Sequence, residues 1–480
     1  MPTEYLHGAE VIEINDGIRP IRTVKSSVIG IIGTAPDADV ATFPINEPVL
    51  IPGNQHMLAK LGVDGTLKDA LEAMFYQTGV TAIVVRVTEA LTPAETMSNI
   101  VGQAGLFTGV HAFLKSEGRF GFRPRILLAP GYTSLRPADG VVSVTVGAGG
   151  TGYTSAPSVA ITGGGGSGAT AHAVIQGGAV TAVVMDTQGA GYTTVPTVAF
   201  TGGGGTGATG TAVRGTAKNP VTGALLGVAQ KLRGMVFADG PATTFEDAIA
   251  WRNDFDTDRL HMIVPEVMQW DVTTSTYVQR PASPVLAGIQ VWLDHNRGFW
   301  HSPSNQAMNQ IGGTSRPIGF TFGDKDSEAN LLNEKNINTI VHWEGWRSWG
   351  NHTASSDELW RFTAVRRTAD MVYDSLIRSA LTWIDKPLSQ KQLIVNIVES
   401  VRAYLRELKT LGAIVGGDCW VDPNLNTEAQ LMQGHLNISL DIEPPAPLER
   451  LTFNAHRNPA YYRVLVSEVL RDLNRLSPAA

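Results

Sequence analysis

The sequence predicts a multi-domain protein of mixed α/β (α+β) class, in which helices cover a mixed sheet. Strand-like apolar runs alternate with helix-like runs between residues 27 and 265, and two long amphipathic stretches follow between residues 358 and 412. In addition, 21 of the 51 glycines lie between Gly140 and Gly215. This bias predicts a small all-β lobe inserted into the α/β domain, in a chain of 480 residues that has room for about three domains.

Composition excludes several classes of protein. The net charge of −7 and the pI near 5.9 argue against a nucleic-acid coat, which needs a basic surface. No basic, then apolar, leader follows Met1, and no apolar run approaches the ~18 residues that span a bilayer. The single Cys419 excludes an internal disulfide and a cysteine-based zinc site. We therefore expect a soluble protein made in the cytoplasm, without membrane insertion or direct nucleic-acid contact.

The α/β domain is predicted from its alternating elements. Residues 27–36 form a β-branched run typical of a strand buried on both faces, and Thr66 is placed to cap the helix that follows. Thr243 and Thr244 begin a segment with capping-box spacing. The other predicted strands are 81–87, 125–130, 235–238 and 260–265, and another helix is predicted near 224–232. Strands separated by helices predict a sheet of largely parallel character.

The glycine-rich lobe is an internal repeat with an offset of 39 residues. The stretch 152–162 and four glycines after it recur at 191–201 with four further glycines. Alternating valine, alanine and threonine between glycine turns predict short antiparallel strands. We expect two similar β units in one lobe with almost no charge.

The last third of the chain is predicted to be helical and then extended. One amphipathic helix is expected over 358–385, a second from Ser389 to a stop at Gly412, and a short one near 427–432. Two alternating strands follow at 436–442 and 448–453, joined by the proline-rich segment 443–447. Because proline makes this linker extended and semi-rigid, the second strand is expected to reach outward.

Three patterns invite a chemical interpretation, and each favours a structural one. The two runs of four glycines lack the lysine of a phosphate loop and favour turns. A metal site is one interpretation of Asp294, His295 and His301, but loop hydrogen bonding is favoured. Sugar stacking or packing at a hairpin edge would explain the three tryptophans, Trp343, Trp346 and Trp349. We expect no enzyme activity, and no catalytic, cofactor-binding or metal site.

Strand donation has positive support in the sequence. Short β-type runs at 11–14 and 19–24 lie at one end of the chain and 448–453 lies at the other, all outside the α/β core. An unpaired strand is costly in water, so each run should complete a sheet, and addition to a neighbouring subunit is one solution. Pairing of the two ends within one subunit remains the alternative.

Several stretches of the chain form a pattern by their order and spacing, namely 19–21 with 27–36, 287–288 with 294–303, 332–338 with 349–353, and 447–453. In this pattern the sequence resembles the contractile tail sheath proteins of myovirus-type bacteriophages and related contractile injection devices. A tail beyond Asn454 with a helix-like 461–473 departs from the family pattern.

The resemblance implies a function and a set of partners. Subunits would form hexameric rings stacked around a tail tube, and contraction would drive the tube through the host envelope for genome ejection. The partners implied are further copies of the chain, the tail tube protein, and the baseplate and tail terminator proteins. The protein would be assembled in the host cytoplasm and would lie in the virion tail.

The resemblance also assigns roles to the two ends. The inter-subunit strand arms would carry Val11, Ile12 and Ile14 at one end and Leu451 and Phe453 at the other. The receiving sheet would contain the residues Leu436, Ile438 and Leu440.

The predicted domain boundaries follow from both arguments. They are an N-terminal arm at 1–24, an α/β core at 25–134 and 217–325, the inserted lobe at 135–216, a C-terminal sheath domain at 326–443, and a C-terminal arm and tail at 444–480. The competing hypothesis is a surface-binding module, in which the glycine-rich repeats contact glycans or the host envelope.

Overall fold

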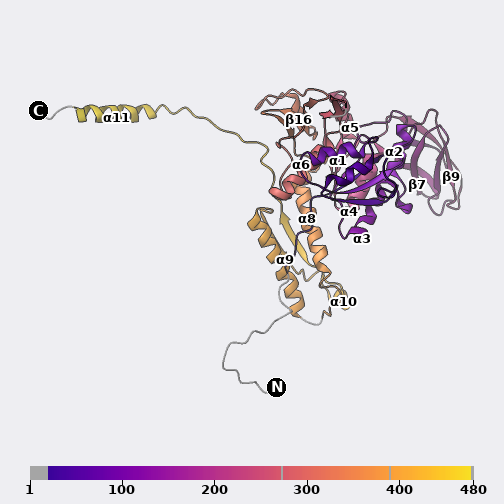
Figure 1. The fold of residues 1–480 in the computed structure, drawn as a ribbon. Helices are drawn as coiled ribbons and strands as arrows, with labels where there is room; N and C mark the ends of the chain where they lie inside the picture. Colours follow the sequence, from indigo (N-terminus) through magenta and orange to yellow (C-terminus); the bar gives the residue numbers. More distant parts are fainter. Residues whose placement is uncertain (1–19, 272–273, 389–390, 477–480) are drawn as a thin grey trace, which may run out of the picture. The chain divides into compact units, whose positions relative to one another are not determined.

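The computed structural model describes residues 20–271, 274–388 and 391–476 (Figure 1). The chain divides after Ala446, and the two parts are described separately. The expected strand residues Val11, Ile12 and Ile14 lie outside the described residues.

The larger part is built on a six-stranded sheet with the order β12-β11-β4-β1-β3-β2. Its strands are β1 (Val28–Thr34), β2 (Pro48–Pro52), β3 (Thr81–Val87), β4 (Ile126–Leu128), β11 (Met235–Asp239) and β12 (Leu260–Ile263). All neighbouring pairs are parallel except β2 with β3. The central β1 places Ile31 opposite Val84 of β3 and Leu128 of β4. The mixed, helix-covered sheet predicted from the sequence is therefore present.

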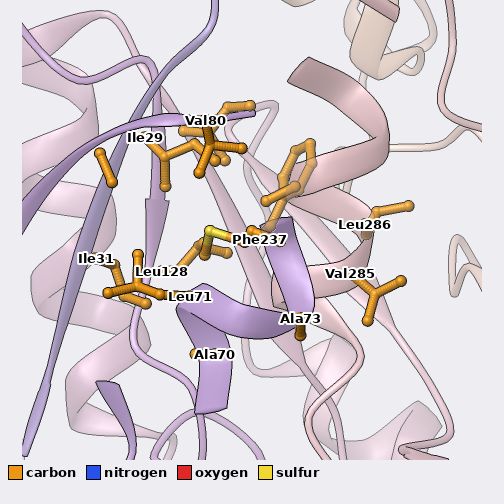
Figure 2. Packing of buried hydrophobic residues seen from close by; sticks show 14 of the residues in the cluster. Ile29, Ile31, Ala70, Leu71, Ala73, Val80, Leu128, Phe237, Val285 and Leu286 are labelled. Carbon is orange, nitrogen blue, oxygen red and sulfur yellow. The ribbon is translucent and has the colours of Figure 1, made fainter. Parts of the chain in front are cut away.

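Helices cover both faces of this sheet because its strands are apolar on both sides. Ile29 and Ile31 of β1 face α1 (Leu67–Phe75) and α6 (Ser283–Asn296), as Figure 2 shows. Val28 and Ile32 point to the opposite face and its helices. These are α2 (Pro93–Val101), η3 (Gly109–Lys115), α4 (Pro220–Leu232) and α5 (Phe245–Asn253). We call the sheet with the elements packed around it the body.

Of the two helix caps predicted from the sequence, the structure confirms one and contradicts the other. The Thr244 hydroxyl accepts a hydrogen bond from the backbone N–H of Asp247 and caps α5. Thr66 makes no such bond to α1, and its hydroxyl instead accepts from the backbone N–H of Thr34 at 3.2 Å. The prediction for Thr66 was wrong because its oxygen binds the end of β1 rather than the first turn of its own helix.

Residues 140–215 form a second six-stranded sheet with the order β5-β10-β9-β6-β7-β8, and the described pairs in it are antiparallel. Its strands are β5 (Gly140–Thr151), β6 (Ser158–Thr162), β7 (Ser167–Gln176), β8 (Ala179–Ala190), β9 (Thr197–Thr201) and β10 (Thr206–Gly215). The central pair places Ala160 opposite Ala199, its counterpart 39 residues later. The outer pairs also match, because Thr206 lies opposite Thr151 and Ser167 opposite Ala190. The sheet is therefore close to two-fold symmetric.

Smaller elements complete the body. They are η1 (Gln55–Leu61), η2 (Ala104–Leu106), α3 (Ser116–Phe120), β13 (Val267–Asp271), β14 (Thr276–Arg280), β15 (Gly313–Thr314), α7 (Glu328–Glu334), β16 (Thr339–His342) and β17 (Trp346–Trp349). Leu332, Ile340 and Ala354 are buried in the clusters that flank the large sheet. Residues that we assigned to a domain beginning at 326 thus pack with the body as far as Ala354.

The C-terminal region contains two long helices and a small sheet. Its elements are η4 (Glu358–Trp360), α8 (Thr363–Ala380), α9 (Lys391–Leu411), β18 (Gly416–Trp420), α10 (Glu428–Met432) and β19 (Ser439–Glu443). The single helix predicted over 358–385 is instead the short η4 followed by α8, because Phe362 between them is extended and its neighbours Arg361 and Thr363 make backbone hydrogen bonds with Thr353 and Asn351. Helix α8 ends at Ala380. Helix α9 ends at Gly412, whose φ is +77°, as predicted, whereas Ser389 lies outside the described residues.

The part after Ala446 contains one helix, α11 (Tyr461–Leu476). The segment 448–453, predicted as a strand, is extended and exposed, and it pairs with no strand among the described residues. No described helix is both long enough and apolar enough to span a bilayer.

Glycine 288 sets the distance between α6 and α1. A Cβ atom at this position would lie 2.8 Å from the backbone oxygen of Met74 and 3.0 Å from Cβ of Gln77. We expect Gly288→Ala to lower the free energy of unfolding by about 1–3 kcal/mol, because the two helices must separate. The matched control is Gly227→Ala in α4, where a Cβ would meet nothing within 4 Å. Gly227→Ala should raise the free energy of unfolding by about 0.5–1 kcal/mol. Equal urea midpoints for the two variants would contradict the close approach of α6 to α1 at Gly288.

Candidate functional site: the junction of α8, α9 and the β18–β19 sheet

Helix α8 is held to the body by buried charges. Four charged side chains, Arg366, Arg367, Asp370 and Asp374, lie on its buried face. Each of them pairs with a residue of the body, and the partners come from different elements. Because a buried charge is stable only when paired, these contacts define where α8 must lie.

The first turns of α8 carry two arginines with carboxylate partners. Arg367 donates to both oxygens of Asp294 in α6, at 3.0 and 2.7 Å, and neither residue is more than 3% exposed. Arg366 donates to Asp258 at 3.1 Å and to Asp370 one turn later at 2.5 Å. Burial disfavours the guanidinium charge of Arg366, but Asp370 and Asp258 outweigh it and raise the pKa of Arg366.

The carboxylates of α8 receive arginines from three loops of the body. Asp370 accepts two hydrogen bonds from Arg259, at 2.6 and 3.1 Å, just before β12. Asp374 accepts from Arg233 at 2.6 Å, which follows α4, and from Arg125, which precedes β4. Burial lowers the pKa of Arg125, although the Asp374 carboxylate opposes the change. We call these contacts of Arg366, Arg367, Asp370 and Asp374 the α8 ion-pair ladder.

A buried histidine lies beside the ladder. His261 of β12 is 1% exposed, and its Nδ1 lies 2.8 Å from the hydroxyl of Thr363, the first residue of α8. Burial lowers the pKa of His261 to about 3, and electrostatic interactions with His352 and Arg367 act in the same direction. The imidazole is therefore neutral at the start of α8.

The other face of α8 packs with α9, the small sheet and the first described residues. Met371 and Val372 of α8 meet Tyr404 and Leu405 of α9 in one apolar cluster, which also contains Ile21. The hydroxyl of Thr23 lies 3.1 Å from that of Tyr404, and the backbone N–H of Val24 donates to Ser375 of α8 at 3.1 Å. The end of the predicted N-terminal arm is thus anchored on α8 and α9 of its own subunit.

The small sheet lies against the same cluster. Strand β18 pairs antiparallel with β19, and Cys419 of β18 faces Leu440 of β19 in register. Cys419 is fully buried, while Ile438, Leu440 and Ile442 are half-buried against α9 and its cluster. These alternate residues lie on one face, as a sheet with one covered face requires. Among the described residues this sheet has only two strands, so its two outer edges are open.

The structure gathers some of the predicted interface residues. Leu440 lies in β19 and Ile438 immediately before it, whereas Leu436 lies in the preceding loop. Leu451 is 64% and Phe453 84% exposed in the part that begins at Pro447. The roles assigned to these residues, and to Val11, Ile12 and Ile14, remain predictions.

The residues considered for a metal site or a phosphate loop make structural contacts instead. Asp294 is a partner of Arg367, and the His295 ring lies 2.9 Å from the Ser27 hydroxyl. Within the described ranges, no group of three or more His, Cys, Asp and Glu side chains could hold a metal ion. The glycine runs form turns, with φ near +74° to +80° at Gly164 and Gly165.

The tryptophans lie around the predicted hairpin. Strands β16 and β17 pair with His342 opposite Trp346. Trp343 stacks on Phe322 with ring centres 5.9 Å apart, and Trp349 meets Phe320 at 5.0 Å. These rings pack on one another at the edge of the body.

Sequence reasoning missed the α8 ion-pair ladder. The apolar positions of 358–385 predicted an amphipathic helix, and Val365 and Val372 are indeed buried. However, the charged residues beside them are buried as well. The only signal in the sequence was the i, i+4 pair of Arg366 and Asp370, which is more often a solvated contact.

Three models of protein-family domains match this chain. Residues 26–87 match the model of the tail sheath protein Gp18 domain III N-terminal region, 208–354 the phage tail sheath protein central domain, and 355–457 the phage tail sheath C-terminal domain. The Escherichia phage P2 tail sheath protein is 31% identical over 478 residues, covering 97% of this chain and 99% of its own. The Burkholderia phage BcepMu tail sheath protein is also 31% identical, with the same coverage. The chain belongs to the phage tail sheath family, whose members are structural proteins of contractile tails.

Solved structures agree on the fold. The sheath complex of an extracellular contractile injection system, PVC, in the contracted state gives a TM-score of 0.58 at 15% identity, covering 96% of this chain and 100% of its own. The contracted helical sheath of the anti-feeding prophage also gives 0.58 at 15% identity, with 95% and 100% covered. At this identity the likeness concerns the fold alone.

Removing one carboxylate from the ladder should loosen α8. Asp374→Asn leaves Arg125 buried without its counter-charge, so we expect the free energy of unfolding to fall by about 3–5 kcal/mol. Protease cleavage near residue 381 should become faster. The control is Glu407→Gln on the exposed face of α9, which should change stability by less than about 0.5 kcal/mol. Equal urea midpoints for the two variants would contradict a role for the ladder in holding α8.

The neutral His261 predicts a pH dependence. Its pKa is about 3 in the folded protein and 6.5 in a model peptide, so below pH 6.5 the unfolded chain binds a proton that the folded chain does not. Above pH 6.5 His261 is neutral in both states and does not change the free energy of unfolding. As the pH falls below 6.5, proton binding to the unfolded chain lowers the free energy of unfolding. Between pH 7 and 5 the wild type should lose about 2 kcal/mol through this group, and His261→Gln should not.

The difference between wild type and variant isolates His261. Asp239, whose pKa burial raises to about 6, acts in the opposite direction, because the folded state binds its proton more tightly below that pH. Asp239 is present in both proteins and cancels. Parallel curves of unfolding free energy against pH for the two proteins would show that His261 does not titrate as described.

Proposed function

We propose that this chain is the structural subunit of a contractile tail sheath. It polymerises as stacked hexameric rings around a tail tube and contracts to drive the tube through the host envelope for genome ejection. Its partners are further copies of itself, the tail tube protein, and the baseplate and tail terminator proteins. It catalyses no reaction, is assembled in the host cytoplasm, and lies in the virion tail.

The observation that carries the proposal is the open β18–β19 sheet. Its strands are five residues each, and neither outer edge is paired among the described residues. A two-stranded sheet is marginally stable in water, and an open edge is a template for another strand. The sheet is therefore suited to receive strands from neighbouring subunits.

The C-terminal segment has the pattern of a strand that would complete this sheet. Leu451 and Phe453 alternate with polar residues, and both side chains are largely exposed. Charge favours the same pairing: residues 416–443 contain five acidic residues and no Lys or Arg, whereas 447–460 contain two Arg and one acidic residue. Strand addition between subunits builds rings or helical arrays, because a head-to-tail contact does not close on itself in a pair.

Contraction requires two packings of the same subunits. The α8 ion-pair ladder favours a subunit that moves as one piece, since rearranging α8 would expose or separate several buried charges. The segments that link neighbouring subunits would then absorb the change in position between neighbours.

The alternative of a glycan-binding lobe finds no support in the side chains. Tyr153 and Tyr192, the aromatic residues of the repeated Gly-Tyr-Thr motif, are 6% and 2% exposed. Their rings lie in the two small cores of the lobe and offer no stacking face.

The proposal is tested by polymerisation of the purified chain. We expect tubes in negative-stain electron micrographs of the full chain, and none from Leu451→Asp/Phe453→Asp, because the charges prevent the strand from packing on the receiving sheet. Deletion of residues 1–19, which spares the anchored Ile21, should also abolish tubes. The control is Thr452→Gln, on the opposite face of the same segment, which should form tubes. Tubes from both arm variants would refute strand donation.

A further inference from the structure

Helix α11 is a feature that the proposed function does not use. Its apolar residues Tyr462, Val466, Val469 and Leu473 recur at helical spacing, and each is at least half exposed. An isolated helix of 16 residues is marginal in water, so burial of an apolar face must supply most of its stability. The helix begins beyond residue 457, where the match to the tail sheath C-terminal domain ends.

We propose that α11 docks on a second copy of this chain, against the segment 421–438 that links β18 to β19. This segment is called the β18–β19 linker below. The inference rests on the proposed function, because the copy that binds α11 is the one that receives the strand 448–453. The helix then acts as a second anchor, adjacent to the donated strand.

The chain length between strand and helix fits this position. Seven residues, 454–460, separate the predicted strand from α11. Extended, they span up to about 25 Å, whereas a five-residue strand is about 17 Å long. The helix can therefore reach the linker from either end of the receiving sheet, whichever direction the strand takes.

The linker offers an apolar surface to an amphipathic helix. Leu425 is 51% exposed and Met432, at the end of α10, is 88% exposed. Trp420, which ends β18 next to the linker, is 42% exposed. Methionine is flexible and adapts to varied apolar partners. These side chains would be covered by the apolar face of α11.

Charge complements the apolar contact. The linker carries Asp422 and Glu428 and no Lys or Arg. Helix α11 carries Arg463, Arg471 and Arg475 and two acidic residues, Glu468 and Asp472, which leaves it with a net charge of +1. Opposite charges around an apolar contact favour this partner and steer the approach.

Truncation separates the helix from the strand. A chain that ends at Asn454 keeps 448–453 and should still form tubes, but its critical concentration for polymerisation should rise at least about tenfold. Val466→Asp/Leu473→Asp should have the same effect, because both side chains lie on the apolar face, while the control Asn474→Asp should behave as the wild type. An unchanged critical concentration in the truncated chain would overturn the inference and leave the proposed function intact. Absence of tubes from the full chain would instead refute the proposed function.

Cross-linking identifies the surface. Tubes are formed from a mixture of Met432→Cys and Val466→Cys chains, one of them carrying a size tag, and oxidised; the native Cys419 is fully buried and does not compete. A disulfide between the two chains is expected, and none in the matched mixture with Val63→Cys, a site that is 73% exposed on the body. A cross-link to position 63 and not to 432 would overturn the assignment.

Two further outcomes would identify a different surface on which α11 docks. A lower melting temperature of the truncated monomer would mean that the helix packs on its own subunit. Binding of the monomer to vesicles of phosphatidylglycerol and phosphatidylcholine, lost on truncation, would mean that a lipid surface covers it. Either result would overturn docking on a second copy.

Discussion

The buried charges of α8 are the constraint on which the rest of the C-terminal region depends. Apolar helix faces can slide past one another at modest cost, but an ion pair removed from water must find its partner at hydrogen-bond distance. The partners of α8 come from loops before β4, after α4 and before β12, and from α6 itself. Contacts with four separate elements thus fix the rotation of α8 about its axis, its position along that axis and the direction of the axis.

The position of α8 then determines what its other face can support. The cluster of Met371, Val372, Tyr404 and Leu405 exists because α8 presents its apolar side away from the body. The β18–β19 sheet and the segment from Ile21 to Val24 both rest on that cluster. The segment from Ile21 to Val24 and the sheet proposed to receive a strand are therefore held by the same two helices.

Sequence patterns predicted the elements whose burial is local and apolar. The strands of the body are buried on both faces, so their continuous β-branched runs identified them, and the 39-residue repeat reappears as the register that pairs Ala160 with Ala199. The ladder could not be predicted, because its partners are far apart in the chain, by 73 residues for Asp294 and Arg367 and 249 for Arg125 and Asp374. The same limit applies to 448–453, whose alternation predicts a strand although a strand also needs a neighbour to pair with.

The α8 ion-pair ladder is costly to rearrange, whereas the proline segment before the C-terminal arm has no buried charge, and this difference constrains how a sheath subunit changes state. Breaking one buried pair costs about 3–5 kcal/mol, a large part of the stability of a typical domain, so a transition that left α8 in place would be strongly preferred. The segment 443–447 has three prolines and no buried charge, and its prolines make it an extended, semi-rigid spacer. If subunits are linked through their ends as proposed, the free energy of contraction must come from the surfaces between subunits rather than from a rearrangement of α8.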